Sequence, residues 1–157
     1  MDIKLNLVET HIVQKVGDNY KYLLMKRSPN EKYPNIWQMV TGSVKRGEKA
    51  YETALRELKE ETNFSPQKMF VVPTINSFYN EENDSIYLIP VFLAIVKPEQ
   101  KVLLSSEHVE YRWESFEVAK DFLAWPGQRK SVDIIKNYLF DNDKSLNFIE
   151  IKLDVTC

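Results

Sequence analysis

Residues 42–64 read GSVKRGEKAYETALRELKEETNF, and this stretch is the most informative part of the sequence. From Lys49 to Thr62 it holds neither glycine nor proline, and its apolar residues recur with a 3.6-residue period. We therefore predict a helix over Lys49–Thr62, with Gly47 in the loop that precedes it.

The predicted helix has two different faces. Glu57, Glu60 and Glu61 are spaced i, i+3 and i+4, so they share one side. The residues that can be buried on the opposite side are Tyr51, Ala54, Leu55, Leu58 and Thr62. Neighbouring carboxylates repel one another unless a cation lies between them, and oxygen ligands of this kind suit Mg²⁺ or Mn²⁺. A glutamate-rich helix can also be mere solvated surface, but the glycine and arginine spacing favours a metal site here.

The whole segment resembles the Nudix box. That family pattern is Gly, five residues, Glu, seven residues, Arg-Glu, an aliphatic residue, one residue and Glu-Glu, and this chain fits it from Gly42 to Glu61. The pattern continues with one residue, a glycine and an aliphatic residue. Asn63 stands in place of the glycine, and Phe64 fills the apolar position. Because asparagine is the best non-glycine residue for a left-handed helix end, we expect the helix to end there.

The resemblance implies a fold and a metal site. The fold would be of the α/β class, a Nudix-type α/β/α sandwich with a mixed central sheet. The implied cofactor is Mg²⁺, with Mn²⁺ as a substitute, and its implied ligands are Glu57, Glu60, Glu61 and the carbonyl of Gly42. Arg56 would pair with Glu48 and orient the site, because an arginine–carboxylate pair can lock a loop onto a helix.

The implied reaction is the attack of water on phosphorus, with metal ions activating the nucleophile. The residues implied to act in catalysis are Arg56, Glu57, Glu60 and Glu107. The general base differs among Nudix subfamilies, and either Glu57 or a carboxylate from a later loop can serve. Glu107 is the candidate for that later carboxylate. The alternative interpretation is that Glu107 is an exposed loop glutamate without a catalytic role. We expect its neighbour His108 to be structural.

The flanks of the box bear on the substrate. Trp37–Val44 reads WQMVTGSV and is similar to the segment before the box in bacterial dihydroneopterin triphosphate pyrophosphatases, as are Glu107–Trp113 and Gln128–Tyr138. The resemblance spans about Leu5–Phe140 and implies pyrophosphate release from dihydroneopterin triphosphate or a (d)NTP. Two alternatives stay open. One is a Nudix hydrolase of a nucleotide sugar or dinucleoside polyphosphate, and the other is a domain that binds a nucleotide without cleaving it.

The substrate-binding candidates are less well defined than the box. Trp37 could stack on a ring, although a tryptophan at a strand start is more often part of the core. Arg27 could meet a phosphate or lie on the surface. Phe78 and, more weakly, Tyr79 are candidates for a ring pocket.

Composition limits the class of protein. A chain of 157 residues predicts one domain, residues 1–157, and its net charge of −2 argues against a protein that binds nucleic acid or an anionic membrane. The partner that the resemblance implies is a small phosphorylated molecule. Cys157 is the sole cysteine, so an internal disulfide is excluded. The start resembles no signal peptide, and the longest apolar run, Leu88–Val96, is shorter than the roughly 20 residues of a membrane span. We expect a soluble, cytoplasmic protein; its oligomeric state stays open, a homodimer included.

The remaining elements follow from local patterns. Strands are expected over Leu5–Val16, Tyr20–Met25, Phe70–Tyr79, Ile86–Val96 and Tyr111–Trp113, and further helices over Phe116–Leu123 and Gln128–Phe140. Pro90 implies that its strand is an edge or contains a bulge. Residues 141–157 form an extension that the resemblance does not cover, and within it Leu146–Val155 could be a final strand or pack on a partner.

Overall fold

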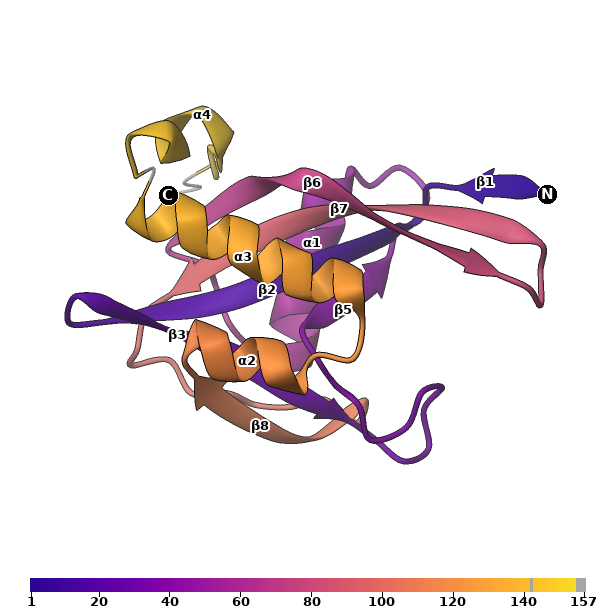
Figure 1. The fold of residues 1–157 in the computed structure, drawn as a ribbon, viewed down its shortest axis with the longest axis horizontal. Coiled ribbons are helices and arrows are strands. Elements are labelled where there is room, and N and C mark those ends of the chain that lie inside the picture. Colours follow the sequence, from indigo (N-terminus) through magenta and orange to yellow (C-terminus); the bar gives the residue numbers. More distant parts are fainter. Residues whose placement is uncertain (142, 155–157) are drawn as a thin grey trace.

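A computed structural model of the protein, which describes residues 1–141 and 143–154, is built around one mixed β-sheet (Figure 1). The main path of the sheet runs β4 (Trp37–Gln38), β3 (Asn19–Arg27), β2 (Leu7–Val16), β7 (Ser85–Val96), β6 (Lys68–Asn80) and β9 (Glu150–Ile151). Beside this path, β1 (Asp2–Lys4) pairs with β7, β5 (Val40–Ser43) with β2, and β8 (His108–Glu114) with β3. The β1–β7 and β2–β7 pairs are parallel and the others antiparallel. This confirms the mixed sheet of an α/β protein.

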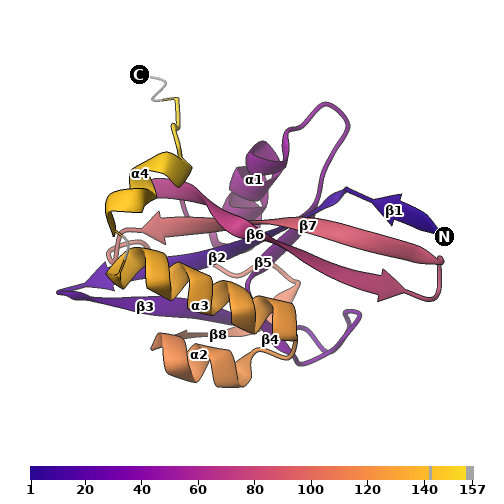
Figure 2. The same cartoon turned by 45° about the horizontal axis from the view of Figure 1, so that its top comes forward.

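Helices cover both faces of the sheet, as Figure 2 shows: α1 (Ala50–Thr62) lies on one face, and α2 (Phe116–Phe122) and α3 (Pro126–Phe140) on the other. Successive strand residues point to opposite faces. Accordingly, Leu24 of β3 packs in the core beneath α2 and α3, whereas its neighbour Leu23 packs with Leu58 of α1. The predicted α/β/α sandwich is therefore confirmed.

The elements predicted from local patterns are present, and their bounds differ by a few residues. The box helix begins at Ala50, one residue later than predicted, with Lys49 as its N-cap. Pro90 lies inside β7, which has neighbouring strands on both sides. The predicted edge position is therefore wrong, and the predicted bulge is confirmed. Pro90 pairs with Ile75 of β6 just after the register shifts between Val72 and Ile75.

The segment after α3 is not one strand. Asp143–Ser145 forms a 3₁₀ turn and Leu146–Ile149 a short helix, α4. Of the described residues after α3, only Glu150–Ile151 adds to the sheet, along the edge of β6. The expected strand over Leu146–Val155 is therefore corrected to two residues, and its last residue, like Cys157, lies outside the described part. In residues 1–141 and 143–154, no helix has the length and apolar character needed to cross a membrane.

Candidate active site

The end of α1 has the left-handed conformation expected of it. Asn63 has φ 63°, and its backbone N–H donates to the carbonyl of Lys59. Phe64 follows and is buried in the core beneath α1. Asn63 therefore ends the helix in the left-handed conformation that the glycine of the family pattern would adopt. The helical spacing of Glu57, Glu60 and Glu61 is kept.

Arg56 joins the box loop to the helix. Its Nε donates to Glu48 Oε1 at 2.7 Å and its Nη2 to Glu48 Oε2 at 3.0 Å, so the pair is bidentate. Nη2 also donates to the carbonyl of Ser43 at 3.1 Å, and Thr53 donates to Glu48 at 2.7 Å. The hydrogen bonds from Arg56, and then from Thr53, lower the pKa of Glu48 to about 2. The expected Arg56–Glu48 pair is present, and it fixes the loop against α1.

Glu61 is the most unusual carboxylate of the box. It is 1% exposed, and neither of its oxygens has a hydrogen-bond partner among the described residues. Burial, followed by the charges of Glu107 and Glu57, raises its pKa to about 9. The charge of Arg27 opposes this rise, and so does the Thr41 amide, which lies near the carboxyl group but outside hydrogen-bond geometry. The helix therefore carries a buried carboxyl group with both oxygens free to bind a ligand.

Gly42 allows α1 to lie close to β5. A Cβ at this position would be 2.2 Å from Cγ of Glu57, far inside van der Waals contact. Only glycine can therefore occupy position 42 while Glu57 stays where it is. The Gly42 backbone and the Glu57 side chain both line the same cleft.

The predicted metal ligands Glu57, Glu60 and Glu61 lie on one helix, but their carboxylates do not converge on a common point. In the described part of the chain, no three carboxylate, histidine or cysteine side chains are gathered at metal-binding spacing. The reason is Arg56, whose Nη1 donates to Glu57 at 2.6 Å and to Glu60 at 3.3 Å. Glu60 is also half exposed, at 53%. Glu57 and Glu60 would have to rotate away from Arg56 to join Glu61, so the metal site stays a prediction.

Glu107 and His108, at the start of β8, lie close to the box carboxylates. Glu107 lines the cleft with Glu57, and its pKa is raised by burial and then by the charge of Glu57. His108 is buried, its Nε2 accepts from the Gln38 amide at 3.0 Å, and its Nδ1 is 3.7 Å from Glu61. Burial lowers the pKa of His108 to about 4, so it is neutral at pH 7. This position fits the structural role expected of His108.

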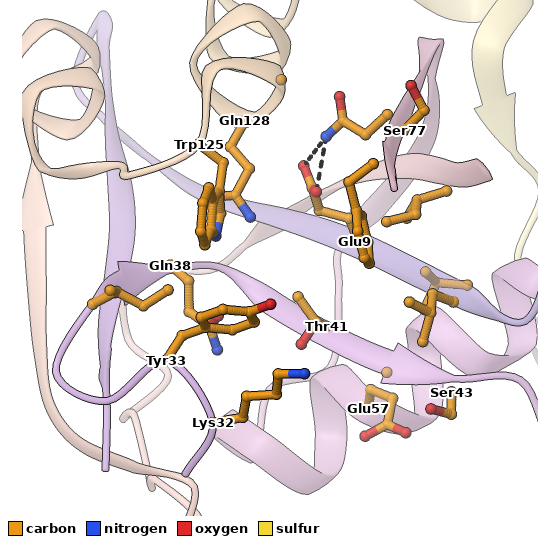
Figure 3. Close-up of a pocket in the computed structure, with 18 of the residues that line it drawn as sticks. Glu9, Lys32, Tyr33, Gln38, Thr41, Ser43, Glu57, Ser77, Trp125 and Gln128 are labelled. Atoms are coloured by element: carbon orange, nitrogen blue, oxygen red, sulfur yellow. Dashed lines mark hydrogen bonds between the residues drawn. The ribbon is translucent and has the colours of Figure 1, made fainter. Parts of the chain in front are cut away.

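A cleft of about 930 Å³ extends from the box to the start of α3 (Figure 3). Glu57 and Ser43 lie at one end, which we call the box end, and Trp125 and Gln128 lie at the other, which we call the ring end. Three cationic side chains, those of Arg27, Lys32 and Lys45, line the cleft as well. The cleft therefore combines carboxylates, cations and aromatic rings, the groups needed to bind a phosphorylated ring compound.

The aromatic candidates from the sequence divide into two groups. Phe78 and Tyr79 line the cleft, and Phe78 stacks on Tyr87 with ring centroids 4.8 Å apart. Trp37 does not line it; this residue packs edge-on against Phe122 at 5.6 Å in the core beneath α2 and α3. The core reading of Trp37 therefore agrees with its position, and its expected substrate contact has no support.

The rings that do form the ring end were missed from the sequence. Tyr33 and Trp125 line the cleft, with centroids 5.4 Å apart in an edge-to-face arrangement. Tyr33 belongs to the proline-containing loop after β3, and Trp125 caps α3. No local pattern joins two residues so far apart in the sequence, although an aromatic residue in a loop is itself a hint of binding.

A buried polar network on β2 was also missed. Nε2 of His11 donates to Glu9 Oε1 at 2.6 Å, and the Tyr22 hydroxyl lies 2.5 Å from His11 Nδ1. The Asn76 amide donates to both oxygens of Glu9, at 3.0 and 2.9 Å. Glu9 and Asn76 line the cleft. The charged and polar residues at 9, 10 and 11, which stand between the apolar pairs Leu7-Val8 and Ile12-Val13, were the signal available in the sequence.

The box, the cleft and the layered sheet together match one family. Residues 7–134 match the NUDIX domain. The chain belongs to the Nudix family of hydrolases. The family and fold expected from the box are thereby confirmed.

Individual relatives of this Nudix protein differ in what they do. It is 27% identical over 135 residues to the octanoyltransferase of Myxococcus xanthus, a match that covers 82% of this chain but only 36% of that protein. It is 26% identical over 123 residues to the dihydroneopterin triphosphate diphosphatase of Escherichia coli K12, covering 65% of this chain and 73% of that one. A solved Ap4A hydrolase binary complex from C. elegans has a TM-score of 0.73 at 22% identity, covering 87% and 98% of the two chains. That last likeness is one of fold.

Proposed function

We propose that this protein hydrolyses a diphosphate linkage in a nucleotide-like substrate with a divalent cation, Mg²⁺ or Mn²⁺. Its ligands would be Glu57, Glu60, Glu61 and the carbonyl of Gly42. The observation that carries this proposal is the buried Glu61 carboxylate, whose two oxygens lack partners among the described residues. A carboxyl group buried in this way carries either a proton or a bound cation, and carboxylate oxygens suit Mg²⁺. The glycine at position 42 supports the fit, because it adds no side chain between β5 and Glu57.

A cation bound there would neutralise charge on the substrate phosphates and acidify water. Glu107, whose pKa burial raises, is suited to accept the proton of the attacking water. The water oxygen would bond to phosphorus while the bond to the bridging oxygen breaks, and the electron pair would leave with pyrophosphate. Arg27, Lys32 and Lys45 line the cleft and would bind the phosphate oxygens.

For the substrate we propose dihydroneopterin triphosphate or a (d)NTP, with release of pyrophosphate. The cleft is large enough for a nucleotide, and the ring end carries the aromatic surfaces of Tyr33 and Trp125. The E. coli relative whose name specifies this pterin supports the same choice. The alternative substrate is a dinucleoside polyphosphate or a nucleotide sugar.

The test is pyrophosphate and phosphate release with Mg²⁺ over dihydroneopterin triphosphate, the dNTPs, ADP-ribose and Ap4A. We expect pyrophosphate from the triphosphates, activity lost in Glu61→Gln, and activity retained in the control Glu99→Gln, which changes an exposed loop carboxylate. A preference for ADP-ribose or Ap4A would overturn the substrate and keep the chemistry. Release of neither product with Mg²⁺ or Mn²⁺ would overturn the hydrolase and favour a domain that only binds.

A further inference from the structure

Glu9 is a buried carboxylate on β2, in the wall of the cleft, and it accepts hydrogen bonds from its neighbours. It is 3% exposed. Oε1 accepts from His11 Nε2 at 2.6 Å and from Asn76 Nδ2 at 3.0 Å, and Oε2 accepts from Asn76 Nδ2 at 2.9 Å. A carboxylate has about four acceptor positions, so these three contacts leave one position, on Oε2.

The residues behind Glu9 fix its direction. His11 and Tyr22 are fully buried, and burial raises the pKa of Tyr22, so its hydroxyl stays protonated and donates to His11 Nδ1. Nε2 of His11 therefore carries the proton that Glu9 accepts. Among the described residues, no lysine or arginine lies within ion-pair distance of Glu9, whose contact with His11 is the hydrogen bond from a neutral ring. The open position of Oε2 therefore lacks a donor from a cationic side chain.

A second polar group stands beside this one at the ring end. Gln128 lines the cleft, is 7% exposed, and its Oε1 has no hydrogen-bond partner in the described part of the chain. A Cβ at Gly127 would be 2.7 Å from Oδ1 of Asn76, so the glycine lets the first turn of α3 lie against the Glu9–Asn76 pair. Figure 3 shows Gln128 and Glu9 facing the cleft on the side where Trp125 stands.

We propose that Glu9 determines substrate specificity by accepting a hydrogen bond from the ring of the substrate. The ring class would carry an amino group next to a ring N–H, the edge that guanine and pterin share. Such an edge offers two adjacent donors, one for Glu9 and one for the Gln128 oxygen, and it turns no lone pair toward the carboxylate. This inference rests on the proposed function only in placing the ring at this end of the cleft.

The test compares dGTP with dITP, which lacks the amino group. Binding of their α,β-methylene analogues is measured by calorimetry with Mg²⁺ for the native protein, Glu9→Gln, and the control Glu99→Gln, which makes the same change at an exposed carboxylate outside the cleft. Because a hydrogen bond to a charged acceptor is strong, we expect the native protein and the control to prefer the dGTP analogue about tenfold or more. In Glu9→Gln the preference should fall to within about twofold. If that variant fails to fold, Glu9→Asp, which shortens the reach and keeps the charge, is expected to lose the preference too.

Equal binding of the two analogues by the native protein would overturn the inference, and so would a preference that survives both substitutions at position 9. Because the measurement is of binding, it is independent of cleavage. A protein that discriminates the analogues but hydrolyses no triphosphate would retain this inference and lose the proposed function. Hydrolysis of dGTP and dITP at equal kcat/KM, with equal binding, would do the reverse.

Discussion

Burial of the Glu61 carboxyl group lowers the stability of the folded protein. Both of its oxygens are buried without partners among the described residues. Because its pKa is raised to about 9, Glu61 must take up a proton when the protein folds at pH 7, which costs stability. Glutamine has no such cost, so we expect Glu61→Gln to raise the Tm of the protein in EDTA by a few degrees. Addition of Mg²⁺ should raise the Tm of the native protein and leave that of the variant unchanged. Thermal unfolding in EDTA and in Mg²⁺ measures both effects, with Glu99→Gln as the control; equal responses to Mg²⁺ would contradict the metal site.

Glu48 makes the stability of the fold depend on pH. Its pKa is lowered to about 2 by the hydrogen bonds of Arg56 and Thr53. A carboxyl group with a depressed folded-state pKa stabilises the fold fully above its unfolded pKa, roughly 4.3, and loses that contribution as the pH falls through about 2. We therefore expect Glu48→Gln to be less stable than the native protein at pH 6 and equally stable near pH 2. Urea unfolding across this range measures the difference; a constant gap would contradict the prediction.

At the scale of elements, the contact between β5 and α1 depends on one missing side chain. A Cβ at Gly42 would meet Cγ of Glu57 at 2.2 Å. We expect Gly42→Ala to push α1 from the sheet, to lower the unfolding free energy by about 1–3 kcal/mol, and to reduce kcat by more than tenfold. The control is Ser43→Ala, which shortens the next side chain on the same strand. Native-like kcat in Gly42→Ala would show that Glu57 can move without loss.

Elements with a strong local pattern could be predicted from the sequence, and short elements could not. The helix α1 and the β2–β3 hairpin have their period or turn within a few residues. By contrast, β1 holds three residues and is defined by its pairing with β7, far along the chain. The site follows the same rule. The box carboxylates lie on one helix, whereas Tyr33 meets Trp125 only because the sheet brings their loops together.

Over the whole molecule, residues 143–154 support the sheet without lining the cleft. Leu146 and Ile149 pack against the core beneath α2 and α3, and Ile151 pairs with Met69 at the edge of β6. We expect a chain ending at Asp141 to lose about 2–4 kcal/mol of unfolding free energy and to aggregate more readily, because the β6 edge is exposed. Its kcat should stay within about twofold of the native value, since none of the described residues that line the cleft follows Gln128.

Urea unfolding, light scattering and steady-state kinetics measure these three effects. Phe148→Ala is the control, because Phe148 lies in the same segment but is 89% exposed. A stable, monodisperse chain ending at Asp141 would show that α4 and β9 add nothing to the core. A large fall in kcat would show that the segment acts on the cleft from a distance.

The parallel pairing of β2 with β7 also sets the order in which the molecule can assemble. It joins Glu9–Gln14 to Val91–Val96, with β3, the whole box and β6 in the intervening chain. Closing so long a loop costs conformational entropy before any contact forms that offsets it, and contacts of high sequence separation form slowly. Helix α1 needs only its own residues to begin forming. Glu9 is the first residue of that pairing, so a refolding chain should recover helicity early and recover its affinity for substrate only in its last kinetic phase.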